Sequence, residues 1–322
     1  MPSLKEIKGR IASVNSTRKI TSAMKMVASS KLHHAQVAIQ NMLPYEELLE
    51  HILKSFLAAE AEAQTIYDQE RPVKRAALVV FTSNSSLCGG FNANTIKLMT
   101  QVVNEYDKTI GRDNVEIYPI GRKVYEKANK MGLKVQGEFS ALADKPNVQQ
   151  CIEIAMELGK KFADGEIDKV ELIYHHFKSA GSQVLTRKTF LPIDIESELQ
   201  ADHERDLTTV IATKESQEYL KKRGERETTH EQEEVKPLND NFIVEPDMDT
   251  VLSQLIPKLA HLMLYTALLD SNASEHAARM VAMQTATDNA DELLRELNLQ
   301  YNTSRQQAIT NELLDIVGGS SN

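Results

Sequence analysis

The chain has 322 residues, of which 41% are apolar and only 5% aromatic, and it contains no tryptophan. Its core must therefore consist mainly of Leu, Ala, Met, Ile and Val, a composition typical of long helices and coiled coils rather than of one large globular core. The net charge of −9 argues against a general nucleic-acid binder, which would carry a basic excess.

The first segment, residues 1–60, has the pattern of a coiled-coil helix. Ser3 is a suitable N-cap, with Glu6 completing a capping box. Alternate steps of three and four from Leu4 to Phe56 give sixteen positions, of which twelve are apolar. We expect a bend rather than an end at Pro44.

The seam of this helix is interrupted at its polar positions Arg18, Thr21 and Lys25. Between them the apolar stripe shifts to Ile20, Met24 and Val27, which predicts that another face of the helix contacts something else there. Residues 1–43 also hold seven Lys or Arg against Glu6 alone, so the helix should favour acidic surroundings.

The second segment, residues 73–195, alternates strands and helices and predicts a Rossmann-like α/β domain with a parallel sheet and an added antiparallel edge. The predicted strands are 75–83, 115–120, 134–139, 170–177 and 183–193. The predicted helices are 92–106, 122–131 and 148–162.

Residues 196–240 form a charged insertion, helical or disordered, because residues 196–236 hold twelve acidic and seven basic residues. A last helix is predicted over 247–317, capped by Asp247 and kinked near Pro257. Its apolar or small residues recur three and four apart, from Ala273 to Leu313. At about 1.5 Å per residue it would be on the order of 100 Å long, so it should pair with the N-terminal helix outside the α/β domain.

No residue pattern in the chain indicates catalysis, a cofactor or a metal. The Gly-rich turn from Leu87 to Phe91 lacks the GxGxxG and P-loop patterns, and it is an ordinary turn, a nucleotide site or a protein-contact loop. His33-His34 and His175-His176 are adjacent pairs, which do not present two ligands on one face. Cys88 and Cys151 form no CxxC pair, which favours reduced thiols.

The chain shows no signal or transit sequence and no run of about 18 apolar residues, so we expect no membrane span. Polar side chains on the final helix are instead candidates for partner contacts, although solvated helix faces explain them equally well from spacing alone. These residues are Arg279, Arg305, Gln306, Thr310 and Glu312.

Several long motifs resemble the γ subunits of F-type ATP synthases. They cover nearly all of the chain except about 196–240, which looks longer than the bacterial pattern and lacks a regulatory cysteine pair. The motifs are Leu4 to Ile11, Thr17 to Ala28, Ser86 to Asn92, Ser274 to Met283, Ala286 to Ala290, Tyr301-Asn302 and Arg305 to Leu313.

The resemblance implies a central-stalk rotor that couples proton flow to ATP synthesis, or ATP hydrolysis to reverse rotation. The paired terminal helices would turn inside three α and three β subunits as an antiparallel coiled coil, with the α/β domain beside ε on the c-ring. Such a chain is not an enzyme and holds no cofactor, and it would lie peripherally on the cytoplasmic side of the cell inner membrane.

The resemblance also implies partner-contact residues. Met24, Lys25 and the loop at Cys88 match the region that faces an acidic segment of β. Arg279, Arg305, Gln306, Thr310 and Glu312 match positions that contact loops of α and β. The rival interpretations are a nucleotide-binding enzyme whose helices only oligomerise it, and a static scaffold.

Overall fold

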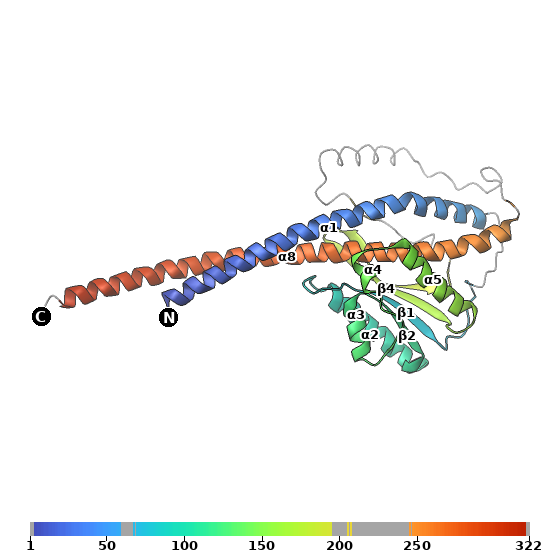
Figure 1. Ribbon diagram of the computed structural model, residues 1–322, viewed down its shortest axis with the longest axis horizontal. Coiled ribbons are helices and arrows are strands. Elements are labelled where there is room, and N and C mark those ends of the chain that lie inside the picture. The colour runs from blue at the N-terminus through green and yellow to red at the C-terminus, as the bar shows by residue number, and fades with distance from the viewer. Residues whose placement is uncertain are drawn as a thin grey trace. The chain divides into compact units, whose positions relative to one another are not determined.

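The computed structural model describes residues 3–58, 67, 69–194, 205, 207, 245 and 247–319. Its longest elements are helices α1 (Leu4–Ala58) and α8 (Met248–Gly319) (Figure 1). The chain divides into two compact units, Met1–Ser29 with Arg279–Asn322 and Ser30–Ala278. We call them the helical unit and the sheet unit and describe each by itself. Both long helices contribute to both units, whereas the four-segment division of the sequence stays a prediction.

Both long helices start at the predicted caps and run through their prolines. The Glu6 amide donates to Ser3 Oγ at 3.2 Å, and the Thr250 amide donates to Asp247 Oδ1 at 2.8 Å. Such caps satisfy amides that have no partner within the first helical turn. Pro44 and Pro257 lie inside continuous helices, so neither proline ends its helix.

The sheet unit contains one five-stranded sheet in the order β3-β2-β1-β4-β5. Strands β1 (Ala76–Phe81), β2 (Val115–Ile120), β3 (Lys134–Val135) and β4 (Lys169–Ser179) are parallel to one another. Strand β5 (Ser182–Leu191) pairs with β4 in the antiparallel direction through a tight hairpin. The predicted Rossmann-like sheet with an antiparallel edge is therefore confirmed.

The connecting helices are α2 (Phe91–Thr109), α3 (Arg122–Lys130), α4 (Ser140–Asp144) and α5 (Val148–Ala163), with a 3₁₀ turn at Arg112–Asn114. The prediction was wrong at β3, which is shorter than 134–139 and is followed by the unpredicted α4. Gly137 has φ +70°, a left-handed conformation that turns the chain out of the sheet.

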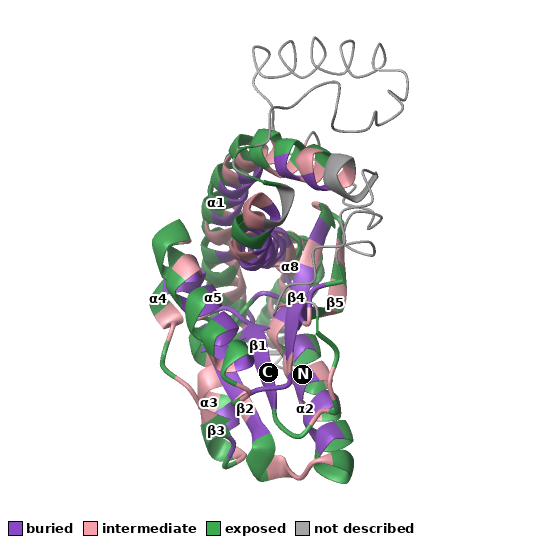
Figure 2. Cartoon of the chain, turned by 90° about the vertical axis from the view of Figure 1, so that its right-hand side faces the viewer, coloured by how far each residue is buried: buried purple, intermediate pink, exposed green. Residues whose placement is uncertain are grey.

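Alternate residues of the central strands build two cores, one on each face of the sheet. Ala76, Leu78 and Val80 of β1 pack in a cluster with α2 and α3. Ala77, Val79 and Phe81 pack in a second cluster with α5 and both long helices. Figure 2 shows the resulting layers, with buried residues along β1 and β4. Because side chains alternate across a strand and both faces are covered, β1 is apolar throughout.

The long helices are part of the second core rather than an appendage to it. Leu49 and Leu53 of α1 and Ile256, Leu264 and Leu268 of α8 belong to the cluster that contains Phe81, Phe162 and Leu172. In this unit the predicted seam is buried from Leu32 through Leu53, with only Met42 and Glu46 partly exposed.

In the helical unit, α1 and α8 pair through a seam that contains a polar layer. Ile7, Ala28, Ala290 and Leu297 are buried there. Thr21 Oγ1 lies 2.8 Å from Thr287 Oγ1, and Arg18 donates to Asp291 at 3.0 Å. Residue numbers rise along one helix as they fall along the other, so the pairing is antiparallel, as predicted.

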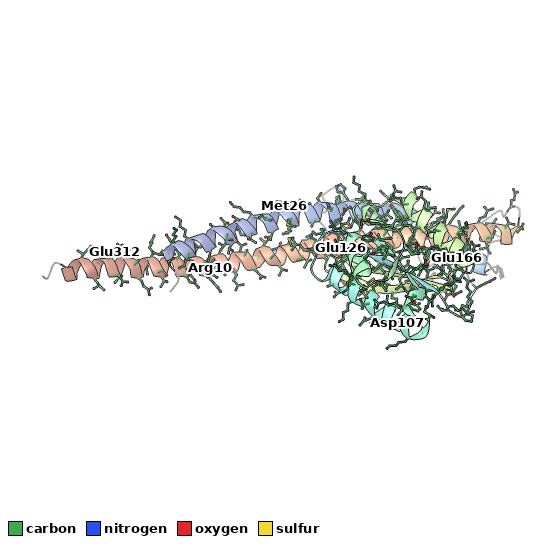
Figure 3. All side chains as sticks on the ribbon, turned by 60° about the horizontal axis from the view of Figure 1, so that its bottom comes forward. Arg10, Met26, Asp107, Glu126, Glu166 and Glu312 are labelled. Atoms are coloured by element: carbon green, nitrogen blue, oxygen red, sulfur yellow. The ribbon has the colours of Figure 1, made fainter. Side chains whose placement is uncertain are left out.

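The predicted interruption of the seam at residues 18–25 was wrong in one respect. Arg18, Thr21 and Lys25 stay on the seam, since none of them is exposed and Thr21 is buried. The side chains that turn outward are Ile20 and Val27, which are 61% and 57% exposed, and Met26 (Figure 3). Polar pairs thus continue the seam, and apolar side chains are exposed on another face of α1.

The charged insertion 196–240 lies outside the described residues except for Arg205 and Leu207. A stretch within Thr250–Leu314 of α8 is long and apolar enough on average to cross a membrane by length and composition alone, although it contains polar residues and is not an unbroken apolar run. Half of that stretch is buried inside the protein, which a core helix would also show, so this is weak evidence for a span.

Candidate functional site

The crevice at the carboxyl ends of β1 and β4 is the expected position of a ligand in a sheet of this kind. In open α/β sheets, ligands bind outside the carboxyl ends of the strands where the strand order reverses. Here the order reverses at β1, because the chain leaves β1 through α2 toward β2 on one side, and β4 lies on the other side. Helix α8 occupies the crevice with an unusually polar segment, Asp270 to His276, all of which is buried.

Hydrogen bonds fix α8 in this position. Asn272 Nδ2 donates to the carbonyl of Ala143 at 2.8 Å, and Ser274 Oγ donates to the carbonyl of His175 at 3.2 Å. A cavity of only about 10 Å³ is left between Phe81, Phe91 and α8. That volume is about the minimum for one water molecule, so a nucleotide does not fit.

His175, the most suggestive titratable group at this edge, is an internal residue. Its ring stacks on Phe91 with 4.4 Å between centroids, and Nδ1 lies 3.3 Å from Thr95 Oγ1. Burial lowers the pKa of His175 to about 4, so the ring is neutral near pH 7. The neutral His175 ring is enclosed between β4 and α2, which indicates a structural role for this residue.

No metal centre is found in the described part of the chain, where no three His, Cys, Asp or Glu side chains gather closely enough to hold an ion. His176 points away from His175 and reaches Asp270 of α8, with Nδ1 2.7 Å from Oδ2. The adjacent histidines on β4 thus serve different neighbours, as expected for consecutive residues of a strand.

The loop after β1 is held by an internal polar network. The Ser83 amide donates to Asn92 Oδ1 at 2.9 Å, and Asn92 Nδ2 donates to Ser83 Oγ at 2.8 Å and to Cys88 Sγ at 3.1 Å. Cys88 is only 2% exposed, so its side chain holds the loop together rather than reaching outward.

The residue that this loop presents is Leu87, which the sequence did not single out. Its side chain is 60% exposed, and its φ of +68° makes it the one non-glycine residue of the described chain with a left-handed backbone. Such strain persists where the surrounding structure enforces it, often at binding sites. The only sequence signal was a large apolar residue beside Gly89 and Gly90.

The other predicted contact residues lie along the helical unit. Met24, Lys25 and Arg279 are partly buried, whereas Arg305, Gln306, Thr310 and Glu312 are exposed; Glu312 is labelled in Figure 3. Thr310 Oγ1 donates to the carbonyl of Gln306 at 2.9 Å. Sequence reasoning missed the exposed apolar residues Leu299, Ile309, Leu314 and Ile316. Leu313, which was predicted to lie on the apolar stripe of the paired helix, is 57% exposed.

These exposed positions turn the end of α8 into a mixed apolar and polar surface. Leu299 is 70% exposed and Ile316 is 68% exposed. Several large apolar side chains exposed close together on one helix indicate a surface that contacts another molecule. The arrangement can bind other proteins.

Comparison with known proteins agrees with this picture. The profile of the ATP synthase family matches residues 3–322. The ATP synthase gamma chain of Phocaeicola vulgatus is 53% identical over 320 residues, and that of Bacteroides thetaiotaomicron is 52% identical over 322 residues. Each alignment covers 99% of both chains, so these relatives also carry a long stretch before the last helix.

Solved structures share the fold at low sequence identity. A rotor chain of the Euglena gracilis mitochondrial ATP synthase has a TM-score of 0.55 and 15% identity, covering 95% of this chain and 98% of its own length. A central-stalk chain of the Tetrahymena thermophila enzyme has a TM-score of 0.51 and 23% identity, covering 83% and 99%. With the near-full-length relatives, these findings establish that the chain belongs to the ATP synthase gamma-chain family.

Proposed function

We propose that this chain is the central-stalk rotor subunit of an F-type ATP synthase. It couples proton flow through the membrane sector to ATP synthesis on the β subunits, and ATP hydrolysis to reverse rotation, without catalysing either reaction. The observation that carries the proposal is the position of α8 in the crevice of the parallel sheet. Because its own helix fills the usual ligand site, the sheet unit supports the helices instead of a nucleotide.

A shaft acts on its partners only through contacts that differ between rotational positions. The described surface of the helical unit is not uniform, since Lys5, Lys8, Arg10 and Lys19 are exposed on α1 and the end of α8 has a mixed apolar and polar surface. Each of the three β subunits would therefore meet a different face. A contact shifts a catalytic site between open and closed states by its difference in binding free energy for the two.

We assign the partner contacts from the resemblance to the family's motifs, and exposed apolar residues beside these positions support the assignment. Met24 and Lys25, together with Ile20, Met26 and Val27, are assigned to an acidic segment of β, and so is the loop that carries Leu87 and Cys88. Arg279, Arg305, Gln306, Thr310 and Glu312 are assigned to loops of α and β. The sheet unit docks on ε and the c-ring, which places the chain peripherally on the cytoplasmic side of the cell inner membrane.

The test is assembly combined with nucleotide binding. We expect the full chain to co-purify with α and β subunits and to support ATP-driven rotation of a probe fixed to the sheet unit. ATP or NAD titrated into the isolated chain should give no binding by calorimetry. Micromolar binding would favour the enzyme interpretation, and an assembled complex that hydrolyses ATP without rotation would favour a static scaffold.

Lys25 provides a graded test of the contact with β. We expect Lys25→Gln to weaken association with the α and β subunits and Lys25→Glu to weaken it further, by tenfold or more, because two facing acidic groups cost several kcal/mol (~1.4 kcal/mol per tenfold). Association is measured by surface plasmon resonance at low and high salt. Equal affinity of both variants and the original chain would remove Lys25 from the contact.

The charged insertion is expected to restrain ATP hydrolysis. Deleting residues 208–236 leaves Arg205 and Leu207 in place and should raise the ATPase rate of the assembled complex without lowering ATP synthesis. A Gly/Ser linker of the same length is the control for chain connectivity. Unchanged hydrolysis and unchanged synthesis in the deletion variant would reject a regulatory role.

A further inference from the structure

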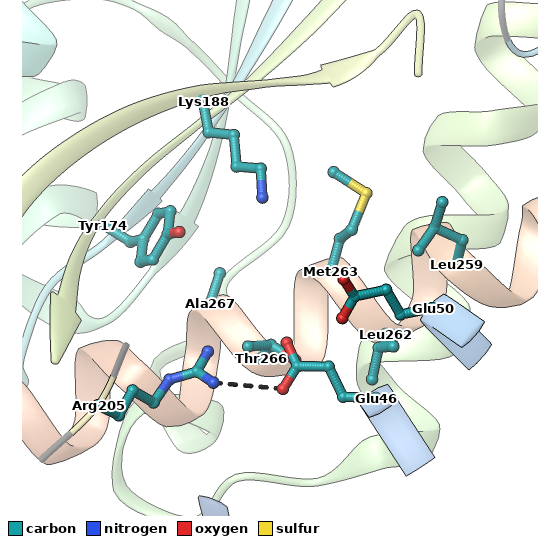
Figure 4. A pocket seen from close by; sticks show the side chains of 10 residues that line it. All are labelled: Glu46, Glu50, Tyr174, Lys188, Arg205, Leu259, Leu262, Met263, Thr266 and Ala267. Atoms are coloured by element: carbon teal, nitrogen blue, oxygen red, sulfur yellow. Dashed lines mark hydrogen bonds and ion pairs between the residues drawn. The ribbon is translucent and has the colours of Figure 1, made fainter. Parts of the chain in front are cut away.

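Arg205 is a charged residue enclosed between the two long helices of the sheet unit. Its side chain is 2% exposed. Its guanidinium donates to Asp270 of α8 through Nε at 2.9 Å and Nη2 at 3.2 Å, and to Glu46 of α1 through Nη1 at 3.2 Å. Figure 4 shows it reaching Glu46 beside a cavity of about 40 Å³ lined by Glu50, Lys188 and Met263.

Asp270 depends on this contact. Its side chain is 1% exposed, and apart from Arg205 its carboxylate meets His176, with Oδ2 2.7 Å from Nδ1. Burial alone would lower the pKa of Arg205, but the carboxylates of Asp270 and Glu46 outweigh it and the pKa is raised, so the guanidinium stays charged. Removing one partner of such a pair leaves the other as an uncompensated buried charge.

The contacts of Arg205 with Asp270 and Glu46 fix one axial position of α1 against α8, which a purely apolar seam does not. Leu49, Leu53, Leu259 and Met263 pack in the surrounding core, and interchangeable apolar side chains repeat along both helices. A slip of one helical turn, about 5.4 Å, would keep many apolar contacts but would separate Glu46 from Asp270 beyond the reach of one planar guanidinium. A single buried polar contact is known to set register in paired helices.

We propose that Arg205, which lies in the sequence between β5 and α8, is a staple that binds both long helices and sets the register of α1 against α8. The staple acts where the helices enter the core of the sheet unit. It therefore makes α1 and α8 of the sheet unit resist axial slip past one another.

The first test is a double-mutant cycle on the full chain. Arg205→Gln and Asp270→Asn are each expected to lower the thermal midpoint by about 6 °C or more, since each leaves a buried charge without its main partner. The double variant, which removes both charges, should recover at least half of the summed loss. Arg122→Gln, which breaks the exposed pair with Glu126, is the control and should change the midpoint by less than ~2 °C. Additive losses in the double variant would overturn the proposed pairing.

The second test separates register from stability. Nitroxide labels at Leu48→Cys on α1 and Lys258→Cys on α8 report the helix-to-helix distance by pulsed electron paramagnetic resonance. A single label at Leu207→Cys reports the mobility of the chain beside Arg205. The two native cysteines are buried. Well below its melting midpoint, Arg205→Gln should broaden or shift the distance distribution and mobilise the Leu207 label, whereas Arg122→Gln should do neither. An unchanged distance distribution or an immobile Leu207 label in Arg205→Gln would overturn the staple.

Discussion

Replacing Gly121 by alanine is expected to destabilise the protein by roughly 3 kcal/mol or more. Gly121 follows β2 with φ +108°, a conformation that side chains rarely adopt. A Cβ added there would lie 2.0 Å from the backbone oxygen of Thr82, an overlap that only a backbone shift can relieve. The Thr82 amide donates to the Ile120 carbonyl at 2.8 Å, so such a shift would disturb the junction of β1 and β2.

Gly132→Ala is the matched control for this prediction. Gly132 also has a positive φ, +67°, but a Cβ there would meet nothing within 4 Å. It should therefore cost only about 1 kcal/mol of backbone strain. The measurement is the free energy of unfolding of each variant in urea, compared with that of the original chain. Equal losses at the two glycines would show that close approach to Thr82 is unimportant.

Replacing Leu87 by asparagine is expected to give the largest functional loss from a single exposed residue. Asparagine tolerates a positive φ better than leucine, so stability should stay the same or rise slightly. The apolar contact would be lost, at about 1–2 kcal/mol, which corresponds to a roughly 5- to 30-fold weaker association with the α and β subunits. Binding is measured with purified subunits, and coupling by ATP-driven proton pumping in vesicles.

Met156→Gln on α5 is the control, since Met156 is a similarly exposed apolar residue, at 61%, on a regular helix. It should leave association and pumping unchanged. Loss of association in both variants would point to a general effect of surface apolar residues. Full pumping by Leu87→Asn would mean that the loop after β1 has no contact with β.

Much of the fold followed from local patterns in the sequence. The heptad of α1 predicted seven residues that are buried, because apolar side chains with this period lie on one face of the helix. These residues are Ile7, Ala28, Leu32, Ala35, Ile39, Leu49 and Leu53. Strand β2 and the starts of α3 and α5 were predicted to the residue. Strand β3 was overestimated because Gly137 adopts a conformation that its neighbours do not reveal.

The candidate site was less predictable. Sequence resemblance pointed to Cys88, but burial depends on how Asn92 and Ser83 fold the loop around the thiol, and this leaves Leu87 as the exposed residue. Polar residues at positions 18–25 looked like an interruption of the seam. Their partners, Thr287 and Asp291, lie more than 250 residues away, so only the pairing of the helices shows that the seam continues.

By itself the sequence determined the long helices, the alternating strands and the absence of a recognisable catalytic motif, since these depend on residues that are close together along the chain. The tertiary structure alone decided that α8 fills the crevice of the sheet and that Arg205 meets Asp270 and Glu46. Those contacts join residues 65 to 159 positions apart, and no local pattern encodes which buried charge or carbonyl a side chain will meet. The physical reason is that hydrogen bonding and charge pairing in a protein interior depend on proximity in space, which exists only once the chain has folded.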